Sequence, residues 1–211
     1  MMLNTSKISA KNFFLNATKK VSILEDRKLL LLKISEAIAN EYSKNKIVNL
    51  NFICTHNSRR SQLGQVWSFF AAHYFKLHIN AFSGGTEVTA FHRNTVKILQ
   101  KAGFSFHLED FSHQNPKYSI SFDGTNTSIL GFSKRFNHTI NPELFIAITT
   151  CNSADINCSF IPNASYRFHL PYVDPKSSDG KDEQHEIYLK TNQQIAAETY
   201  FIFSEVKKLL S

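Results

Sequence analysis

The feature that most constrains the fold is an apolar segment that passes through a short polar loop into a helical pattern. Residues 47–54 (IVNLNFIC) are rich in β-branched and apolar side chains, which is typical of a buried strand. After the loop THNSRR, residues 61–77 carry apolar side chains at helical spacing. The chain therefore contains a strand–loop–helix unit, which is a building block of parallel sheets.

The rest of the chain continues this alternation. The apolar patterns predict strands at 79–85, 144–151 and 166–175, and helices at 88–104 and 185–209. We therefore expect an α/β fold in which a mostly parallel central sheet has helices on both faces.

The N-terminal region stands outside this alternation. Residues 22–42 have the spacing of an amphipathic helix, with Ser22 as its N-cap and Glu25 three residues later. We expect residues 1–46 to form an N-terminal helical extension.

The remainder, residues 47–211, is expected to form one α/β domain with an insertion at about 111–143. Within the insertion, an Asp-Gly pair between two alternating segments predicts a β-hairpin at 118–132. We interpret the insertion as an extra antiparallel edge pair. The alternative is a lid or partner surface that brings Lys134 and Arg135 near a bound anion.

Length and charge narrow the choice of function. The chain has 211 residues and a formal net charge of +7 at pH 7, so it is long enough for a sizeable core and favours anionic partners. Its basic residues are scattered, so we expect no nucleic-acid partner. No apolar stretch is long enough to span a membrane, and the N-terminus lacks the apolar core of a secretory signal. We therefore expect a cytoplasmic protein without a membrane partner.

The cysteines do not indicate a disulfide framework or a metal site. There are three of them, an odd number that does not suggest extracellular pairing. The sequence has no C-x-x-C pair and no His/Cys cluster with zinc spacing, so we expect no metal.

The segment FICTHNSRRS places Cys54 at the carboxyl end of the first predicted strand. Ligands of doubly wound sheets bind there, against helix N-termini whose N–H groups attract anions. Arg60 can add a bidentate fork to an oxyanion, Ser61 can donate to the Cys54 thiolate, and Asn57 can hold the loop in shape. The alternative interpretation is a buried structural cysteine followed by a surface arginine.

The stretch C-T-H-N-S-R-R-S resembles the C-x5-R-[ST] loop of low-molecular-weight protein tyrosine phosphatases. It is most similar to the C-T-G-N-S-C-R-S form of thioredoxin-coupled arsenate reductases. His56 stands where the family usually has glycine, and Arg59 also departs from the pattern. The resemblance implies an oxyanion-binding loop made of Thr55, His56, Asn57, Ser58, Arg59, Arg60 and Ser61.

A second segment, CNSADINC at 151–158, resembles the C-x6-C redox segment of the arsenate reductases. The resemblance implies a thiol relay through Cys54, Cys151 and Cys158, with thioredoxin as the reductant. If this segment were helical, the Cα atoms of Cys151 and Cys158 would lie about 10.5 Å apart. A disulfide spans about 7 Å at most, so the segment would have to unwind before these cysteines could pair.

A third segment, YVDPKSSDG at 172–180, resembles the family's Asp-Pro loop, in which the aspartate is the general acid. The resemblance gives this role to Asp174. The phosphatases typically carry aromatic residues after the Asp-Pro pair, whereas Lys176, Ser177 and Ser178 follow here. This difference favours a small inorganic oxyanion over a phosphotyrosyl side chain.

The sequence thus predicts an arsenate reductase that converts arsenate to arsenite without a cofactor. One alternative is a tyrosine phosphatase that hydrolyses phosphomonoesters through a cysteinyl-phosphate. Another is a non-catalytic module that keeps only the anion-binding loop. For the favoured function, the predicted catalytic residues are Cys54, Arg60, Asp174, Cys151 and Cys158.

Overall fold

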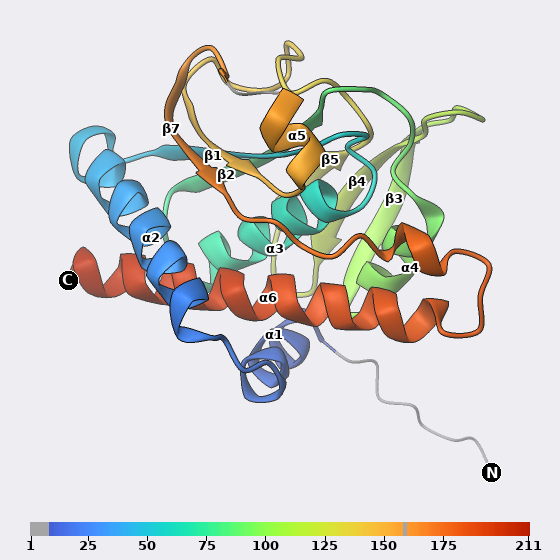
Figure 1. The fold of residues 1–211 in the computed structure, drawn as a ribbon, viewed down its shortest axis with the longest axis horizontal. Coiled ribbons are helices and arrows are strands. Elements are labelled where there is room, and N and C mark those ends of the chain that lie inside the picture. Colours follow the sequence, from blue (N-terminus) through green and yellow to red (C-terminus); the bar gives the residue numbers. More distant parts are fainter. Residues whose placement is uncertain (1–8, 158–159) are drawn as a thin grey trace.

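The computed structural model describes residues 9–157 and 160–211 (Figure 1). Its main sheet has four strands in the order β2-β1-β6-β7, and all pairings are parallel. The predicted parallel α/β sheet is therefore confirmed. The strands are β1 (Val48–Cys54), β2 (Ile79–Gly85), β6 (Phe145–Thr149) and β7 (Ala164–His169).

The register aligns the carboxyl ends of the three strands β2, β1 and β6. Cys54 is paired with Gly85 on one side of β1, and Ile53 is paired with Thr149 on the other. Segments that follow these strands therefore meet at one edge of the sheet, where parallel α/β proteins bind ligands.

Helices cover this sheet, and the longest of them, α6, contacts α1, α2, α3 and α4. Figure 1 shows α6 running across the molecule with α1 and α2 beside it. A 3-10 turn, η1, precedes α6 in the chain. The bounds are α1 (Ala10–Lys20), α2 (Glu25–Asn45), α3 (Arg60–Phe75), α4 (Arg93–Lys101), α5 (Asn152–Asn157), η1 (Pro175–Ser178) and α6 (Gln184–Leu209).

The described part of the N-terminal region, residues 9–46, contains two helices, of which only α2 was predicted. Ser9 caps the additional helix α1 and accepts a hydrogen bond from the Asn12 amide at 3.2 Å. The prediction that Ser22 caps the next helix is wrong, because α2 begins after Leu24. Residues 21–24 instead form the extended link that separates the two helices. Both helices contribute to the main core, and the domain boundary at residue 46 stays a prediction.

The helix predicted at 88–104 is shorter than its pattern, because α4 begins only at Arg93. The preceding residues bind the polypeptide that follows β1. The Glu87 amide donates to the Thr55 carbonyl at 2.8 Å, and the His92 amide donates to the Ser58 carbonyl at 3.0 Å. Tertiary hydrogen bonds therefore override the helical pattern there.

The predicted hairpin is present, but it does not extend the parallel sheet. Strand β3 joins it in a separate antiparallel sheet with the order β3-β4-β5. Phe104 and Phe122 from this sheet pack their rings edge-on against Phe70 of α3. The hairpin is thus drawn onto α3 rather than to the sheet edge. The bounds are β3 (Phe104–Asp110), β4 (Lys117–Phe122) and β5 (Ile129–Gly131).

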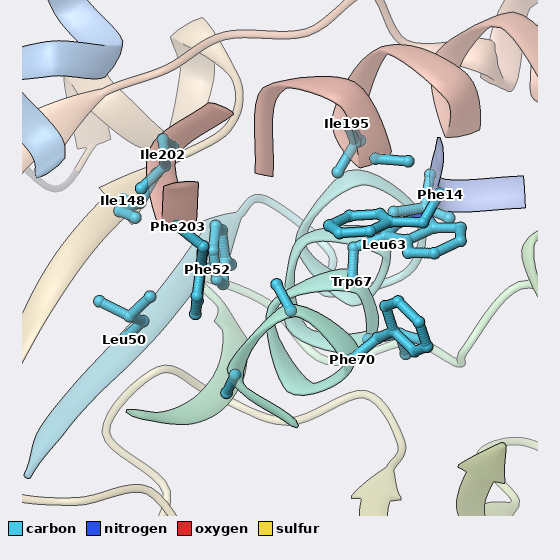
Figure 2. Packing of buried hydrophobic residues seen from close by; sticks show 14 of the residues in the cluster. Phe14, Leu50, Phe52, Leu63, Trp67, Phe70, Ile148, Ile195, Ile202 and Phe203 are labelled. Carbon is cyan, nitrogen blue, oxygen red and sulfur yellow. The ribbon is translucent and has the colours of Figure 1, made fainter. Parts of the chain in front are cut away.

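The main core lies between the parallel sheet and the helices. Trp67 is fully buried there; it stacks on Phe14 of α1 and meets Phe70 edge-on, as Figure 2 shows. A second cluster includes Ile53, Phe145 and Ala154 of α5. Within the described part of the chain, no helix has the length and apolarity that crossing a membrane requires.

Candidate active site

The segment that follows β1, here called the Cys54 loop (residues 54–61), is shaped by a buried asparagine. Asn57 has a φ of 45°, a left-handed conformation that asparagine tolerates better than most residues. Its side-chain amide donates to Ser61 Oγ at 2.9 Å, and its Oδ1 accepts from the Lys134 amide at 3.0 Å. Gln62 holds the Asn57 carbonyl from α3 at 3.0 Å. The loop is therefore fixed from inside the protein.

Ser61 connects this support to the thiol. Its Oγ lies 3.0 Å from Cys54 Sγ and already accepts the hydrogen bond from Asn57. The hydroxyl proton of Ser61 is therefore free to be donated to the Cys54 sulfur. Cys54 itself is only 4% exposed.

Arg60, the first residue of α3, reaches the segment of Asp174. Its Nη2 donates to Asp174 Oδ2 at 2.6 Å, and its Nη1 donates to the Tyr172 carbonyl at 3.0 Å. The Nε of Arg60 is buried and has no hydrogen-bond partner among the described residues. This open donor is available to a hydrogen-bond acceptor such as an anionic ligand.

Cys151 follows β6, the neighbour of β1. Its Sγ lies 3.5 Å from Thr55 Oγ1 and 3.4 Å from the amide of Ala154, to which it can be bonded. Cys151 and Cys54 belong to the same buried cluster. The structure thus brings together two of the predicted cysteines, whereas Cys158 lies outside the described residues.

The short helix α5 is attached to the sheet through Asp155. This carboxylate accepts hydrogen bonds from Thr149 Oγ1 at 2.8 Å and from the guanidinium of Arg167. His169 on β7 lies within 3.5 Å of Asp155 and 3.1 Å of Asn152 Oδ1. These side chains come from β6 and β7, so α5 is bound to the edge of the sheet by a polar network.

The two unusual residues of the Cys54 loop have other partners. The His56 ring lies 3.2 Å from Glu87 Oε2, at the surface. Arg59 donates through Nε to Tyr188 OH at 2.6 Å and through Nη2 to Asp179 Oδ2 at 2.5 Å. Of the predicted oxyanion-binding residues, His56 and Arg59 therefore contribute only their backbone to the inside of the loop. Ser58 is buried, with its carbonyl bound to residue 92.

The insertion supports the loop from behind. Ser133 Oγ donates to the His56 carbonyl at 2.8 Å, next to the bond between Lys134 and Asn57. The Lys134 side chain is 2% exposed, and burial lowers its pKa to about 8. Arg135 donates to the Thr86 carbonyl at 2.8 Å. The insertion contacts the loop through a hydroxyl and a backbone amide, and neither basic side chain is bonded to Cys54, Arg60 or Asp174.

Several supporting residues had no sequence signal that indicated their role. Asp179 and Tyr188 look like a turn residue and a helical core residue, and only the fold brings them to Arg59. Gly85 could be noticed as the glycine that ends β2. A Cβ there would lie 2.7 Å from the Thr55 carbonyl oxygen and 2.9 Å from the Asn57 nitrogen, so glycine permits the close approach of the loop. Within residues 9–157 and 160–211, no cluster of His, Cys, Asp or Glu is arranged to hold a metal ion.

Comparison with curated proteins finds relatives of one kind. The chain is 28% identical over 141 residues to a protein of Bacillus subtilis named arsenate reductase, covering 67% of this chain and 82% of the relative. It is 25% identical over 141 residues to an arsenate reductase of Bacillus licheniformis, covering 63% and 78%. An arsenate reductase 1 of Staphylococcus epidermidis is 28% identical, with 63% and 82% covered. No protein-family model matches the chain.

Solved structures show the same fold at lower identity. A mutant of YwlE from Bacillus subtilis superposes with a TM-score of 0.52 and 14% identity, covering 76% of this chain and 99% of that one. A low-molecular-weight protein tyrosine phosphatase from T. tengcongensis gives a TM-score of 0.52 and 15% identity, covering 74% and 98%.

The strand order and the solved structures give this chain an α/β fold like that of a low-molecular-weight protein tyrosine phosphatase. The curated relatives add similarity of sequence to this likeness of fold. They confirm the predicted resemblance to the superfamily that contains arsenate reductases and low-molecular-weight protein tyrosine phosphatases, and they support an enzyme of that superfamily.

Proposed function

We propose that this protein is an arsenate reductase that works by a thiol relay and is regenerated by thioredoxin. The observation that carries the proposal is the position of Cys151 beside the Cys54 loop, 3.5 Å from Thr55 Oγ1. Cys54 ends β1, and Cys151 lies two residues beyond the end of the neighbouring strand β6, so the two cysteines stand at adjacent strand ends. Phosphate-ester hydrolysis needs only the Cys54 thiol; in a phosphatase the second thiol would serve only to protect Cys54 by reversible oxidation.

In the first step, Cys54 thiolate attacks the arsenic atom of arsenate. A sulfur–arsenic bond forms, an arsenic–oxygen bond breaks, and the departing oxygen takes a proton from Asp174 and leaves as water. Backbone N–H groups of the Cys54 loop and the open Nε of Arg60 bind the remaining oxygens. Because Nη2 of Arg60 is bonded to Asp174 at rest, that pair opens when the oxyanion binds.

In the second step, Cys151 thiolate attacks the Cys54 sulfur. A Cys54–Cys151 disulfide forms, and the electron pair of the sulfur–arsenic bond passes to arsenic, which leaves as arsenite. Cys158 thiolate then attacks Cys151, which releases Cys54 and leaves a Cys151–Cys158 disulfide. Two thiols of thioredoxin reduce this disulfide. The helix α5 spans Asn152–Asn157, so the last exchange requires it to unwind, as the helical geometry predicts.

The decisive assay measures arsenate reduction with thioredoxin, thioredoxin reductase and NADPH, beside hydrolysis of an aryl phosphate. We expect steady turnover for the wild type, and at most one arsenite per molecule for Cys151→Ser. Ser153→Ala, an exposed change on α5, is the matched control and should keep turnover. Full multiple turnover by Cys151→Ser would reject the relay.

Aryl-phosphate hydrolysis that is unaffected by Cys151→Ser, without arsenate turnover, would indicate the phosphatase alternative. A protein without activity on either compound would indicate the anion-binding module.

A further inference from the structure

We propose that Arg59 is a positioning residue that fastens the Asp-Pro segment (residues 174–179) to the Cys54 loop and so holds Asp174 in place as the acid. The inference deepens the proposed function and rests on it, because it assumes that Asp174 donates a proton. It assigns a role to the arginine by which this loop departs from the family's pattern.

Two adjacent arginines hold the two ends of the Asp-Pro segment. Arg60 is bonded to Asp174, which is the N-cap of η1, and Arg59 is bonded to Asp179, which is its C-cap. Only the turn Pro175–Ser178 lies between the two aspartates. The segment is therefore attached to the Cys54 loop at both ends.

The two attachments differ in whether they have to break during the reaction. The oxyanion needs the Arg60 guanidinium, so the bond between Arg60 and Asp174 has to open in each cycle. The bond between Arg59 and Asp179 can stay closed, because the Arg59 side chain does not bind the oxyanion. With Asp174 released, Arg59 is the arginine that keeps the segment against the loop.

The pair of Arg59 and Asp179 is anchored to two helices. Asp179 Oδ1 accepts from Tyr188 OH of α6 at 2.8 Å and from Asn94 Nδ2 of α4 at 3.0 Å. Tyr188 OH in turn accepts from Arg59 Nε at 2.6 Å. The Asp179 side chain is 27% exposed, against 41% for Asp174. A half-buried pair with every oxygen bonded is worth more than a surface ion pair.

The charges of this cluster suit a lasting contact at neutral pH. Burial acts to raise the pKa of Asp179, but the Tyr188 hydrogen bond and the charge of Arg59 outweigh it and lower that pKa. Burial and the Arg59 charge lower the pKa of His92, whose Nδ1 lies 3.2 Å from Tyr188 OH. Burial raises the pKa of Tyr188 to about 12. Near pH 7 the cluster therefore holds one cation, one anion and two neutral rings.

The kinetic test is a double-mutant cycle on arsenate reduction. Arg59→Gln should lower kcat by about 10-fold or more, with little change in KM, because general-acid catalysis is worth about 10²–10⁴-fold. In an Asp174→Asn background the same change should have less than about a twofold effect, since the group it positions is gone. Equal losses in both backgrounds would overturn the positioning role. Arg93→Gln, an exposed change of the same charge on α4, is the control.

Hydrogen exchange tests the contact independently of turnover. With saturating inorganic phosphate to occupy Arg60, residues 174–179 of the wild type should stay protected. Arg59→Gln should speed their exchange by about 10-fold, and Asp179→Asn should do the same from the other side of the pair. Unchanged exchange in both variants would overturn the contact. If the wild type were inactive on arsenate but exchange behaved as expected, the proposed function would fail and the contact would stand.

Discussion

The Cys54 loop and the helix α5 both carry a cysteine at the same edge of the sheet, but the protein holds them in different ways. Asn57 of the loop is fully buried, and its backbone and side chain are bonded to α3 and to the insertion. By contrast, α5 has six residues and is tied to the sheet mainly through Asp155. Isolated helices shorter than about 12 residues are marginal in water. The difference suits a fixed nucleophile and a movable second thiol.

The largest effect is expected from removing the fixed nucleophile. Cys54→Ser should abolish arsenate reduction, because a serine hydroxyl at this position is far less nucleophilic than a thiolate. The assay is arsenite formation, and binding of inorganic phosphate by calorimetry serves as the control for an intact loop. Arsenite formation at even one-tenth of the wild-type rate would mean that another cysteine attacks first.

Substituting Asn57 should destabilise the Cys54 loop. Asn57→Ala should lower the free energy of unfolding by about 2–3 kcal/mol, since it leaves buried partners unpaired and puts alanine at a left-handed φ. Urea unfolding measures this change. A loss below about 0.5 kcal/mol would show that the loop does not depend on this residue.

The insertion that supports the Cys54 loop contains a lysine, Lys134, whose charged form is disfavoured by burial. Burial lowers the pKa of Lys134 from 10.5 to about 8, so between these values the unfolded chain binds more protons and stability due to this lysine rises with pH. Lys134→Met should therefore be more stable than the wild type at pH 7 by about 2 kcal/mol. Thermal unfolding of both proteins measures the gain, which should shrink between pH 8 and 10. A gain that stays constant with pH would contradict the buried charge.

A substitution that weakens the attachment of α5 should affect α5 and leave the rest of the protein unchanged. Asp155→Asn weakens the attachment of α5 to Arg167 and His169, and it should cost about 1 kcal/mol or less of global stability because the pair is partly exposed. Hydrogen exchange in α5 should nevertheless become faster, while exchange in the Cys54 loop stays the same. Faster exchange in both regions would mean that they are held as one unit.

The strands of the parallel sheet could be predicted from the sequence, because buried strands such as β1 are continuous apolar segments. Most of the helices could be predicted as well. The prediction missed α1 and β3: the helix predicted at 88–104 ends where β3 begins, and the rest of β3 was assigned to no element. Local pattern also failed for residues 86–92, which take their conformation from hydrogen bonds to the Cys54 loop.

In the candidate site, too, the local sequence pattern predicted some features, whereas others depend on tertiary contacts. Cys54, Arg60 and Asn57 were indicated by a local motif. The bond between Arg59 and Asp179 joins residues 120 positions apart, and no spacing predicts it. Likewise, only the strand order places Cys151 beside Thr55.

In the proposed relay, Cys54 bonds to arsenic and Cys151 attacks the Cys54 sulfur, so the two thiols together supply the two electrons that reduce arsenate. The most direct test mixes reduced Cys158→Ser protein with arsenate in a single turnover and maps its disulfides by peptide mass spectrometry. We expect one Cys54–Cys151 disulfide for each arsenite released. Arsenite released without that disulfide would contradict the relay.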